Sequence, residues 1–390
     1  MPEVDRHPLL ITLVHGTRFF PRLTAIWLVA QAWYHRRRHR RPLWFEGSSP
    51  FLARLRCELE DVPHKIRPLS WSGANSIFER DKAAHSLANY LLAEHAEHPR
   101  ATQLIIAHSY GGNIALRALH HLQMRDVSHS ADGVNPFVVT LATPFIEIHQ
   151  ANFGARPLVM RVAWLFVICY ILSILVDFFP AFLFPSLRHE WYVVLPVIVI
   201  LCVLMGWWWI FRRANTRQTK LDTLKNATRL GKLSGDRLFV IRAIDDEASL
   251  FLTFGTIVNY IMANTIMYLF LIFGASGPII LFSTENKWFP HWTYAACVAG
   301  FIVLTITFFA MHIASRLVHG RELALSPMEC RVNTHSAPDA VDLSQIVTLV
   351  SHNYVKLLRH TIYEHEACVK VISDWVRSQL GAQRALESHH

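Results

Sequence analysis

A single serine, Ser109, stands where an apolar segment typical of a β-strand meets a segment typical of a helix. Residues 104–108 read Leu-Ile-Ile-Ala-His, and Tyr110, Gly111 and Gly112 follow the serine. A sharp turn between a strand and a helix lifts a serine hydroxyl above the end of a sheet, where a base and a substrate can both reach it. Small residues are needed beside such a turn because the strand and the helix pass close to it. The pattern therefore predicts a nucleophilic serine.

A serine nucleophile needs a base, because its hydroxyl is barely ionised at neutral pH, and the base needs an acid that orients it. Two apolar, strand-like runs later in the chain are each followed by a suitable residue. Residues 238–243 lead into Asp245 and Asp246, and residues 346–350 lead into His352. We therefore predict His352 as the base and one of the two aspartates as the acid.

The chain has 23 histidines, so the choice of the base needs a reason. His335 is the main alternative to His352, but no clear strand-like run precedes it. His108, directly before the serine, is expected to pack within the turn. His15 is expected to bond the backbone of its own loop and to have no catalytic role.

The elements that must position these residues can be read from apolar periodicity. Helices are expected over residues 75–96 and 113–125 and from about residue 354 to residue 380. Six apolar runs are expected to form the strands: residues 9–14, 65–71, 104–108, 137–142, 238–243 and 346–350.

At residues 107–112, Ala-His-Ser-Tyr-Gly-Gly, the chain resembles the α/β-hydrolase superfamily, and within it the lipase and esterase branch that uses an A-H-S-x-G-G turn. Ala107 stands where the common G-x-S-x-G pattern has its first glycine, and the order serine, acid, histidine is also that of the superfamily. The resemblance implies a doubly wound, mostly parallel sheet. It covers about residues 8–150, 236–249 and 340–380. It also rests on His15-Gly16, on the W-S-G-x-N-S-x-x-x-R pattern at residues 71–80, and on Thr143-Pro144.

The resemblance further implies the roles of individual residues. Thr17, which follows the His-Gly pair, and Tyr110, which follows the serine, would supply the backbone N–H groups of an oxyanion hole. The Asp-Glu-Ala-Ser ending of residues 246–249 favours Asp246 over Asp245 as the acid. These residues complete a triad of Ser109, Asp246 and His352.

Such a triad implies hydrolysis of a carboxylic ester, with a lipid or another long-chain acyl ester as the substrate and with no metal or cofactor. An acyltransferase or a thioesterase would use the same residues. A non-catalytic membrane scaffold with a hydrolase fold is a third alternative. The six cysteines show no C-x-x-C spacing, which argues against a zinc site or a disulfide framework.

The composition is more apolar than is usual for a soluble protein, with 52% hydrophobic residues and a mean hydropathy of +0.25. The net charge of +9 suits a surface on anionic lipid headgroups, and no nucleic-acid-binding motif is present. Four apolar runs are long enough to cross a bilayer, which takes about 20 residues. They predict two inserted transmembrane hairpins and membrane lipids as partners. The runs are residues 158–183, 191–211, 250–273 and 292–314.

The distribution of Lys and Arg predicts the topology of these spans. Residues 185–190 and 283–291 hold one basic residue each, whereas residues 212–242 and both termini are rich in them. Both termini and all catalytic parts are therefore expected in the cytoplasm, and the oligomeric state is not indicated. The expected organisation is a hydrolase core at 1–157, a hairpin at 158–211, a strand with the acid at 212–249, a hairpin at 250–314, and a C-terminal core with the histidine at 315–390.

Overall fold

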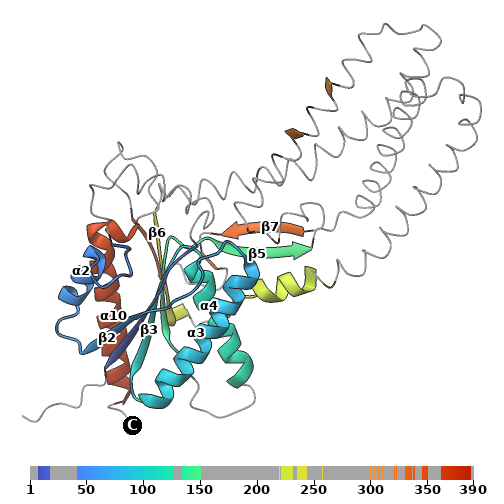
Figure 1. Ribbon diagram of the computed structural model, residues 1–390. Helices are drawn as coiled ribbons and strands as arrows, with labels where there is room; N and C mark the ends of the chain where they lie inside the picture. The colour runs from blue at the N-terminus through green and yellow to red at the C-terminus, as the bar shows by residue number, and fades with distance from the viewer. Residues whose placement is uncertain are drawn as a thin grey trace, which may run out of the picture.

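The computed structural model shows three layers, with helices on both faces of a central sheet (Figure 1). It describes residues 8–17, 42–126, 134–150, 221–231, 235–243, 330–335, 345–349 and 362–387, together with a few single positions between residues 219 and 338. Helices α2 and α10 lie on one face of the sheet, and α3 and α4 lie on the other. The helices of these two layers are Pro50–Glu58 (α2), Ile77–Glu97 (α3), Gly111–Asp126 (α4) and Glu366–Glu387 (α10), and residues 221–228 are helical as well.

The central sheet has six strands in the order β2-β1-β3-β4-β6-β8, and all of its pairings are parallel. This confirms the predicted α/β class, and each of the six predicted runs contributes a strand. A separate antiparallel pair, β5 and β7, was not predicted. The strands are Leu9–Val14 (β1), His64–Pro68 (β2), Thr102–His108 (β3), Phe137–Leu141 (β4), Phe145–Gln150 (β5), Leu238–Ala243 (β6), Cys330–His335 (β7) and Ile346–Leu349 (β8).

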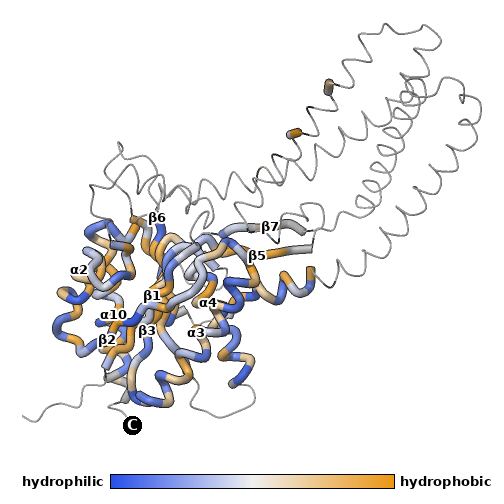
Figure 2. Tube along the Cα trace, viewed as in Figure 1, coloured by the Kyte–Doolittle hydropathy of each residue, from blue (hydrophilic) through white to orange (hydrophobic). Residues whose placement is uncertain are grey.

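Alternate residues of the central strands feed two separate apolar cores, because successive side chains of a strand point to opposite faces. In β3, Leu104 and Ile106 pack towards α2 and α10, whereas Ile105 and Ala107 pack towards α3 and α4. Both faces are therefore covered, which is the usual condition of a parallel sheet. Figure 2 shows that hydrophilic and hydrophobic residues also recur in turn along the helices, as expected for helices that pack one face on the sheet.

The strand order places a topological switch point between β1 and β3. From β1 the chain moves outwards to the edge strand β2, and it then returns to form β3 on the other side of β1. Beyond β3 the order runs outwards in the opposite direction, to β4, β6 and β8. In open α/β sheets, ligands bind outside the carboxyl ends of the strands at such a point. The segments after β1 and β3 are therefore the place to look for a site.

No helix among the residues that the structure describes is long and apolar enough to cross a membrane. The predicted multi-pass membrane location with four spans, and with it the cytoplasmic placement of the termini, is wrong on this finding. The longest described helices, α3 and α10, interleave charged with apolar residues because each packs only one face on the sheet. The four apolar runs lie outside the described residues, apart from a few positions in the third and fourth runs.

A polar cluster joins α3 to α4 beside the apolar core that these two helices form with the sheet. Asp81 accepts hydrogen bonds from Arg117 Nε at 2.7 Å and from His121 Nε2 at 3.0 Å. The rings of His85 and His121 stack with their centroids 3.7 Å apart. Burial, followed by the charge of Arg117, lowers the pKa of His121 and of its neighbour His120 below the ordinary value of 6.5.

These shifts predict a loss of stability in mild acid. Because the pKa values of His120 and His121 are lowered in the folded chain, the unfolded chain takes up these protons first as the pH falls. The stabilising contribution is therefore complete above about pH 6.5 and is lost below it. The double variant His120→Gln/His121→Gln should show a shallower decline in the free energy of unfolding between about pH 7 and pH 5. Chemical denaturation across this range measures the slope, and an unchanged slope would contradict the assignment.

Candidate active site

Ser109 occupies a strained backbone conformation between β3 and α4. Its φ is +56°, in the left-handed region that non-glycine residues rarely adopt. Its backbone N–H donates to the carbonyl of Leu141 at 2.9 Å, which anchors the turn to β4. Strain of this kind persists only when the surroundings enforce it, and it concentrates at functional sites. A serine on a strained strand-to-helix turn is the arrangement of a nucleophile elbow.

Three glycines allow the neighbouring segments to close around this turn. A Cβ on Gly16 would lie 2.6 Å from the Cβ of Ser109 and 3.0 Å from its Oγ. A Cβ on Gly111 would lie 2.4 Å from the carbonyl oxygen of Val14, and one on Gly112 would lie 2.2 Å from Thr143 Oγ1. A side chain at Gly16 or Gly111 would press on the neighbouring backbone, and one at Gly112 would displace the side chain of Thr143. The ends of β1, β3 and β4 therefore meet at Ser109 only because these positions lack side chains.

The loop after β1 contacts the serine side chain and contains Thr17, the predicted oxyanion donor. The imidazole of His15 is buried, and its Nδ1 lies 2.8 Å from the carbonyl oxygen of Gly16. The ring stacks on Phe45 and on Trp71, with centroid distances of 4.7 Å and 5.3 Å. His15 thus bonds the backbone of its own loop, as the sequence suggested. The N–H of Thr17 remains a predicted donor.

Tyr110, the second predicted oxyanion donor, lies one residue before α4. Backbone N–H groups at this end of a helix have no intrahelical acceptor, and the helix dipole favours negative charge there. The phenol ring is buried beneath the guanidinium of Arg80, whose Cζ lies 4.5 Å from the ring centroid. Burial raises the pKa of Tyr110 to about 12, so this phenol stays neutral at physiological pH.

Arg80 belongs to a buried network that explains the W-S-G-x-N-S-x-x-x-R pattern. Its Nη1 donates to Asn75 Oδ1 at 3.0 Å, and burial lowers the pKa of its guanidinium. Ser76 caps α3 by accepting from the N–H of Glu79 at 3.2 Å. The carboxylate of Glu322 accepts from the Ser76 hydroxyl and from the first backbone N–H of α3. Glu322 had not been singled out in the sequence, because nothing local marks it as a partner of α3.

His108 packs between aromatic side chains, as predicted. Its ring lies edge-on to Trp44 at 5.8 Å and to Tyr363 at 5.1 Å between centroids. Tyr363 belongs to the short helix η6, Ile362–Glu364, which precedes α10. The chain that leaves the sheet after β8 therefore returns to the residue that directly precedes Ser109.

The predicted acid and base, Asp245 or Asp246 and His352, lie outside the described residues. The strands that precede them are described and adjacent, with Ala243 of β6 in register with Leu349 of β8. Asp246 and His352 are each the third residue after these partners. Because the central strands are parallel, β6 and β8 end on the same side of the sheet as β3, which leads into Ser109.

His335, the alternative base, ends β7, a strand that the sequence did not reveal. Its Nε2 lies 3.9 Å from Glu147 Oε2 of β5, and the residue pairs in register with Phe145. The strand lacks the apolar alternation used for the other elements, since it reads Cys-Arg-Val-Asn-Thr-His. The β-branched residues Val332 and Thr334 were the one signal that could have marked it, since such residues are enriched in strands.

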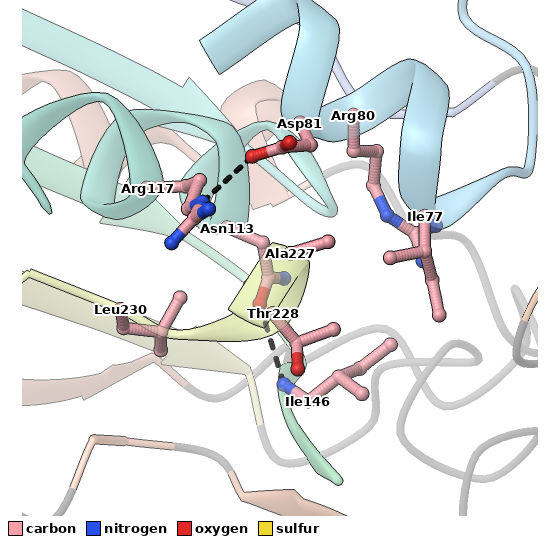
Figure 3. Close-up of a pocket in the computed structure, with 9 residues that line it drawn as sticks. All are labelled: Ile77, Arg80, Asp81, Asn113, Arg117, Ile146, Ala227, Thr228 and Leu230. Atoms are coloured by element: carbon pink, nitrogen blue, oxygen red, sulfur yellow. Dashed lines mark hydrogen bonds and ion pairs between the residues drawn. The ribbon is translucent and has the colours of Figure 1, made fainter. Parts of the chain in front are cut away.

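A small pocket lies between α3, α4, β5 and residues 227–230 (Figure 3). Its volume of about 20 Å³ accommodates about one water molecule. Asn113 lines the pocket, and its side-chain amide donates to the carbonyl of Pro144 at 2.6 Å and accepts from the N–H of Ile146 at 3.3 Å. Ser109 does not line this pocket. Asn113 therefore fixes the segment after β4, and the pocket is too small for an ester substrate.

The contact of Gly111 with β1 predicts a cost for any side chain there. Gly111→Ala should lower the free energy of unfolding by about 1–3 kcal/mol, as overpacking does, because the backbone carbonyl of Val14 cannot move aside. Gly381 in α10 provides a matched control, since nothing lies within 4 Å of its Cβ position. Gly381→Ala should raise the free energy of unfolding by about 0.5–1 kcal/mol. Urea denaturation measures the free energy of unfolding of both variants. Equal effects would contradict the close contact between position 111 and Val14.

No protein-family model, curated protein or solved structure matches this chain. The function must therefore be argued from the residues around Ser109, their geometry and their chemistry.

Proposed function

We propose that this protein is a serine hydrolase of the α/β-hydrolase fold that cleaves carboxylic esters through Ser109, His352 and Asp246. The observation that carries the proposal is the φ of +56° at Ser109, in a turn that approaches the end of β1 closely because Gly16 and Gly111 have no side chains. Among the described residues, Ser109 and Ala142 are the non-glycine residues with a positive φ, and they directly follow β3 and β4. Ser109 is the one of the two that carries a nucleophile, and a reactive hydroxyl held at the end of a sheet suits this strained turn.

The position of the turn in the fold supports the same proposal. Ser109 follows β3 and the Gly16–Thr17 loop follows β1, so both lie at the topological switch point. The start of α4 directs its positive dipole end towards Ser109 and favours negative charge beside it. The Ser109 side chain is almost buried, with the residue 8% exposed, so charge that develops at its Oγ is poorly screened by water.

The described residues on either side of the segments with the other two triad residues support the same proposal. Asp246 and His352 follow adjacent strands in register, and η6 then brings the chain back to His108 through Tyr363. The twelve residues 350–361 thus join the end of β8 to a contact beside Ser109. His352 belongs to that connection in the sequence, whereas His335 faces Glu147 in the separate sheet, and we therefore favour His352 as the base.

The proposed mechanism begins when His352 removes the proton from Ser109 as its Oγ attacks the ester carbonyl. The N–H groups of Thr17 and Tyr110 bind the oxyanion, and Asp246 stabilises the imidazolium. His352 then gives its proton to the departing alcohol, which leaves an acyl group on the serine. A water molecule, deprotonated by His352, attacks this acyl-enzyme, the bond between the acyl group and Oγ breaks, and His352 returns the proton to Ser109 as the carboxylic acid leaves. The chemistry requires no metal or cofactor.

The substrate class that we propose is an acyl ester with an apolar chain, such as a lipid. Aromatic rings flank the turn on the side of α2, where Trp44, Phe45 and Tyr363 surround His108 and His15. These rings suit an apolar chain better than a charged one. Transfer of the acyl group to another acceptor would use the same residues, so product analysis must accompany any measurement of ester turnover.

The nucleophile assignment predicts the behaviour of Ser109→Ala. This variant should lose covalent labelling by a fluorophosphonate probe and should hydrolyse a panel of p-nitrophenyl acyl esters about 10³-fold or more slowly, as triad variants do. Ser86→Ala, at an exposed position of α3, is the control and should behave as the wild type. Persistence of near wild-type hydrolysis in Ser109→Ala would refute the assignment, and an unlabelled wild-type protein would favour a scaffold.

The base and acid assignments are tested by paired variants. His352→Ala should abolish ester turnover, because the serine then has no base, whereas His335→Ala should retain it. Asp246→Asn should reduce kcat far more than Asp245→Asn, because the acid fixes the imidazole tautomer. Steady-state kinetics on the same ester panel measure all four variants. The reverse ranking within either pair would transfer the role to the other residue.

A further inference from the structure

Two hydrogen bonds fix the two peptide units on either side of Gly16. The carbonyl oxygen of Gly16 lies 2.8 Å from His15 Nδ1. The carbonyl oxygen of His15 accepts from Trp71 Nε1 at 2.9 Å. A carbonyl oxygen can only accept, so His15 Nδ1 carries the proton in this contact. Side chains therefore hold both units, in addition to any restraint from the backbone itself.

The bond to Gly16 also sets the direction of the next N–H group. The peptide unit between Gly16 and Thr17 is planar and trans, like every other peptide unit among the described residues. In a trans unit the C=O and N–H groups point in opposite directions. The imidazole that holds the Gly16 carbonyl on one side therefore turns the Thr17 N–H to the other side.

This peptide unit lies directly beside the nucleophile. A Cβ on Gly16 would lie 3.0 Å from Ser109 Oγ, so the Gly16 backbone is the neighbour of the hydroxyl that attacks, with no side chain between them. A change in the orientation of the unit therefore changes which group, carbonyl or N–H, faces an oxyanion bound to Ser109. The carbonyl would repel such an oxyanion, and the N–H would stabilise it.

Ring stacking restrains the imidazole that holds the unit. His15 lies almost parallel to Phe45, with 19° between the ring planes, and almost parallel to Trp71, with 21°. Trp71 thus acts twice, through its ring on the imidazole and through its Nε1 on the His15 carbonyl. It comes from the segment after β2, so the edge strand takes part in orienting the loop after β1.

We infer that His15 and Trp71 are positioning residues that orient the backbone N–H of Thr17 for the oxyanion. This inference rests on the proposed hydrolase function and deepens it, since neither side chain takes part in proton transfer. Their contribution is made in the transition state, where negative charge develops, and it is absent from the bound substrate. Removing either contact should therefore lower kcat and leave KM almost unchanged.

The test compares variants that separate hydrogen bonding from ring stacking. His15→Phe keeps an aromatic ring and removes the Nδ1 donor, whereas His15→Asn restores an N–H at nearly the same place. Trp71→Phe keeps a ring and removes the Nε1 donor. Trp375→Phe is the matched control, because Trp375 Nε1 donates to Gln345 Oε1 at 3.1 Å on the far side of the sheet.

The expected result is a fall in kcat for His15→Phe and Trp71→Phe of between about 10-fold and the 10²–10³-fold effect of losing a whole oxyanion donor. KM should change little, and the affinity for an alkyl boronic acid, which forms a tetrahedral adduct with the serine, should fall in parallel. His15→Asn should recover part of kcat, and Trp375→Phe should match the wild type. A structural role alone would lower thermal stability without this separation of kcat from KM.

Undiminished kcat in both His15→Phe and Trp71→Phe, together with Ser109-dependent labelling of the wild type, would overturn the inference and leave the hydrolase proposal intact. Absence of Ser109-dependent labelling in the wild type would refute the proposed function and the inference with it. Circular dichroism identifies any variant that does not fold. If His15→Phe does not fold, Trp71→Phe decides, because its bond lies outside the core strands.

Discussion

The parallel pairing of β1 with β3 is the constraint on which the site depends. It brings the carboxyl ends of two strands together at the switch point, with Val14 in register with Ala107. The residues just beyond, Gly16 and Ser109, then meet at a distance that admits no side chain on the glycine. A displacement of one strand by a single residue would turn its side chains to the other face of the sheet and would separate the loop from the serine.

A buried charged network supports the turn from the side of α3. Burial of an unpaired charge is costly, and the Arg80 guanidinium is compensated by Asn75, by the ring of Tyr110 and by Glu322. Glu322 also satisfies N–H and hydroxyl groups at the start of α3. The network therefore fixes the helix that flanks the elbow, and it does so with a residue from a distant part of the sequence. Removal of one partner would leave the others buried without compensation.

The differences between expectation and structure have identifiable causes. The helix α2 was not expected, because a nine-residue element begun by Ser49 and Pro50 shows too little periodicity to stand out. The strand β7 escaped notice because it lies outside the central sheet and has little apolar alternation. The membrane spans were inferred from the hydropathy of apolar runs, whereas the long described helices α3, α4 and α10 are amphipathic ones whose apolar faces pack on the sheet.

The sequence by itself determined the strands of the central sheet and the strand–serine–helix turn. Both follow from short-range properties, namely runs of apolar residues and glycines where the backbone must turn or approach closely. Only the tertiary structure decided that Gly16 touches Ser109, that Arg80 covers Tyr110 and that His15 and Trp71 hold the peptide before Thr17. These contacts join residues that are far apart along the chain, so they depend on strand order and register. Local sequence patterns carry little information about either, because any parallel arrangement of the same strands would bury the same apolar faces.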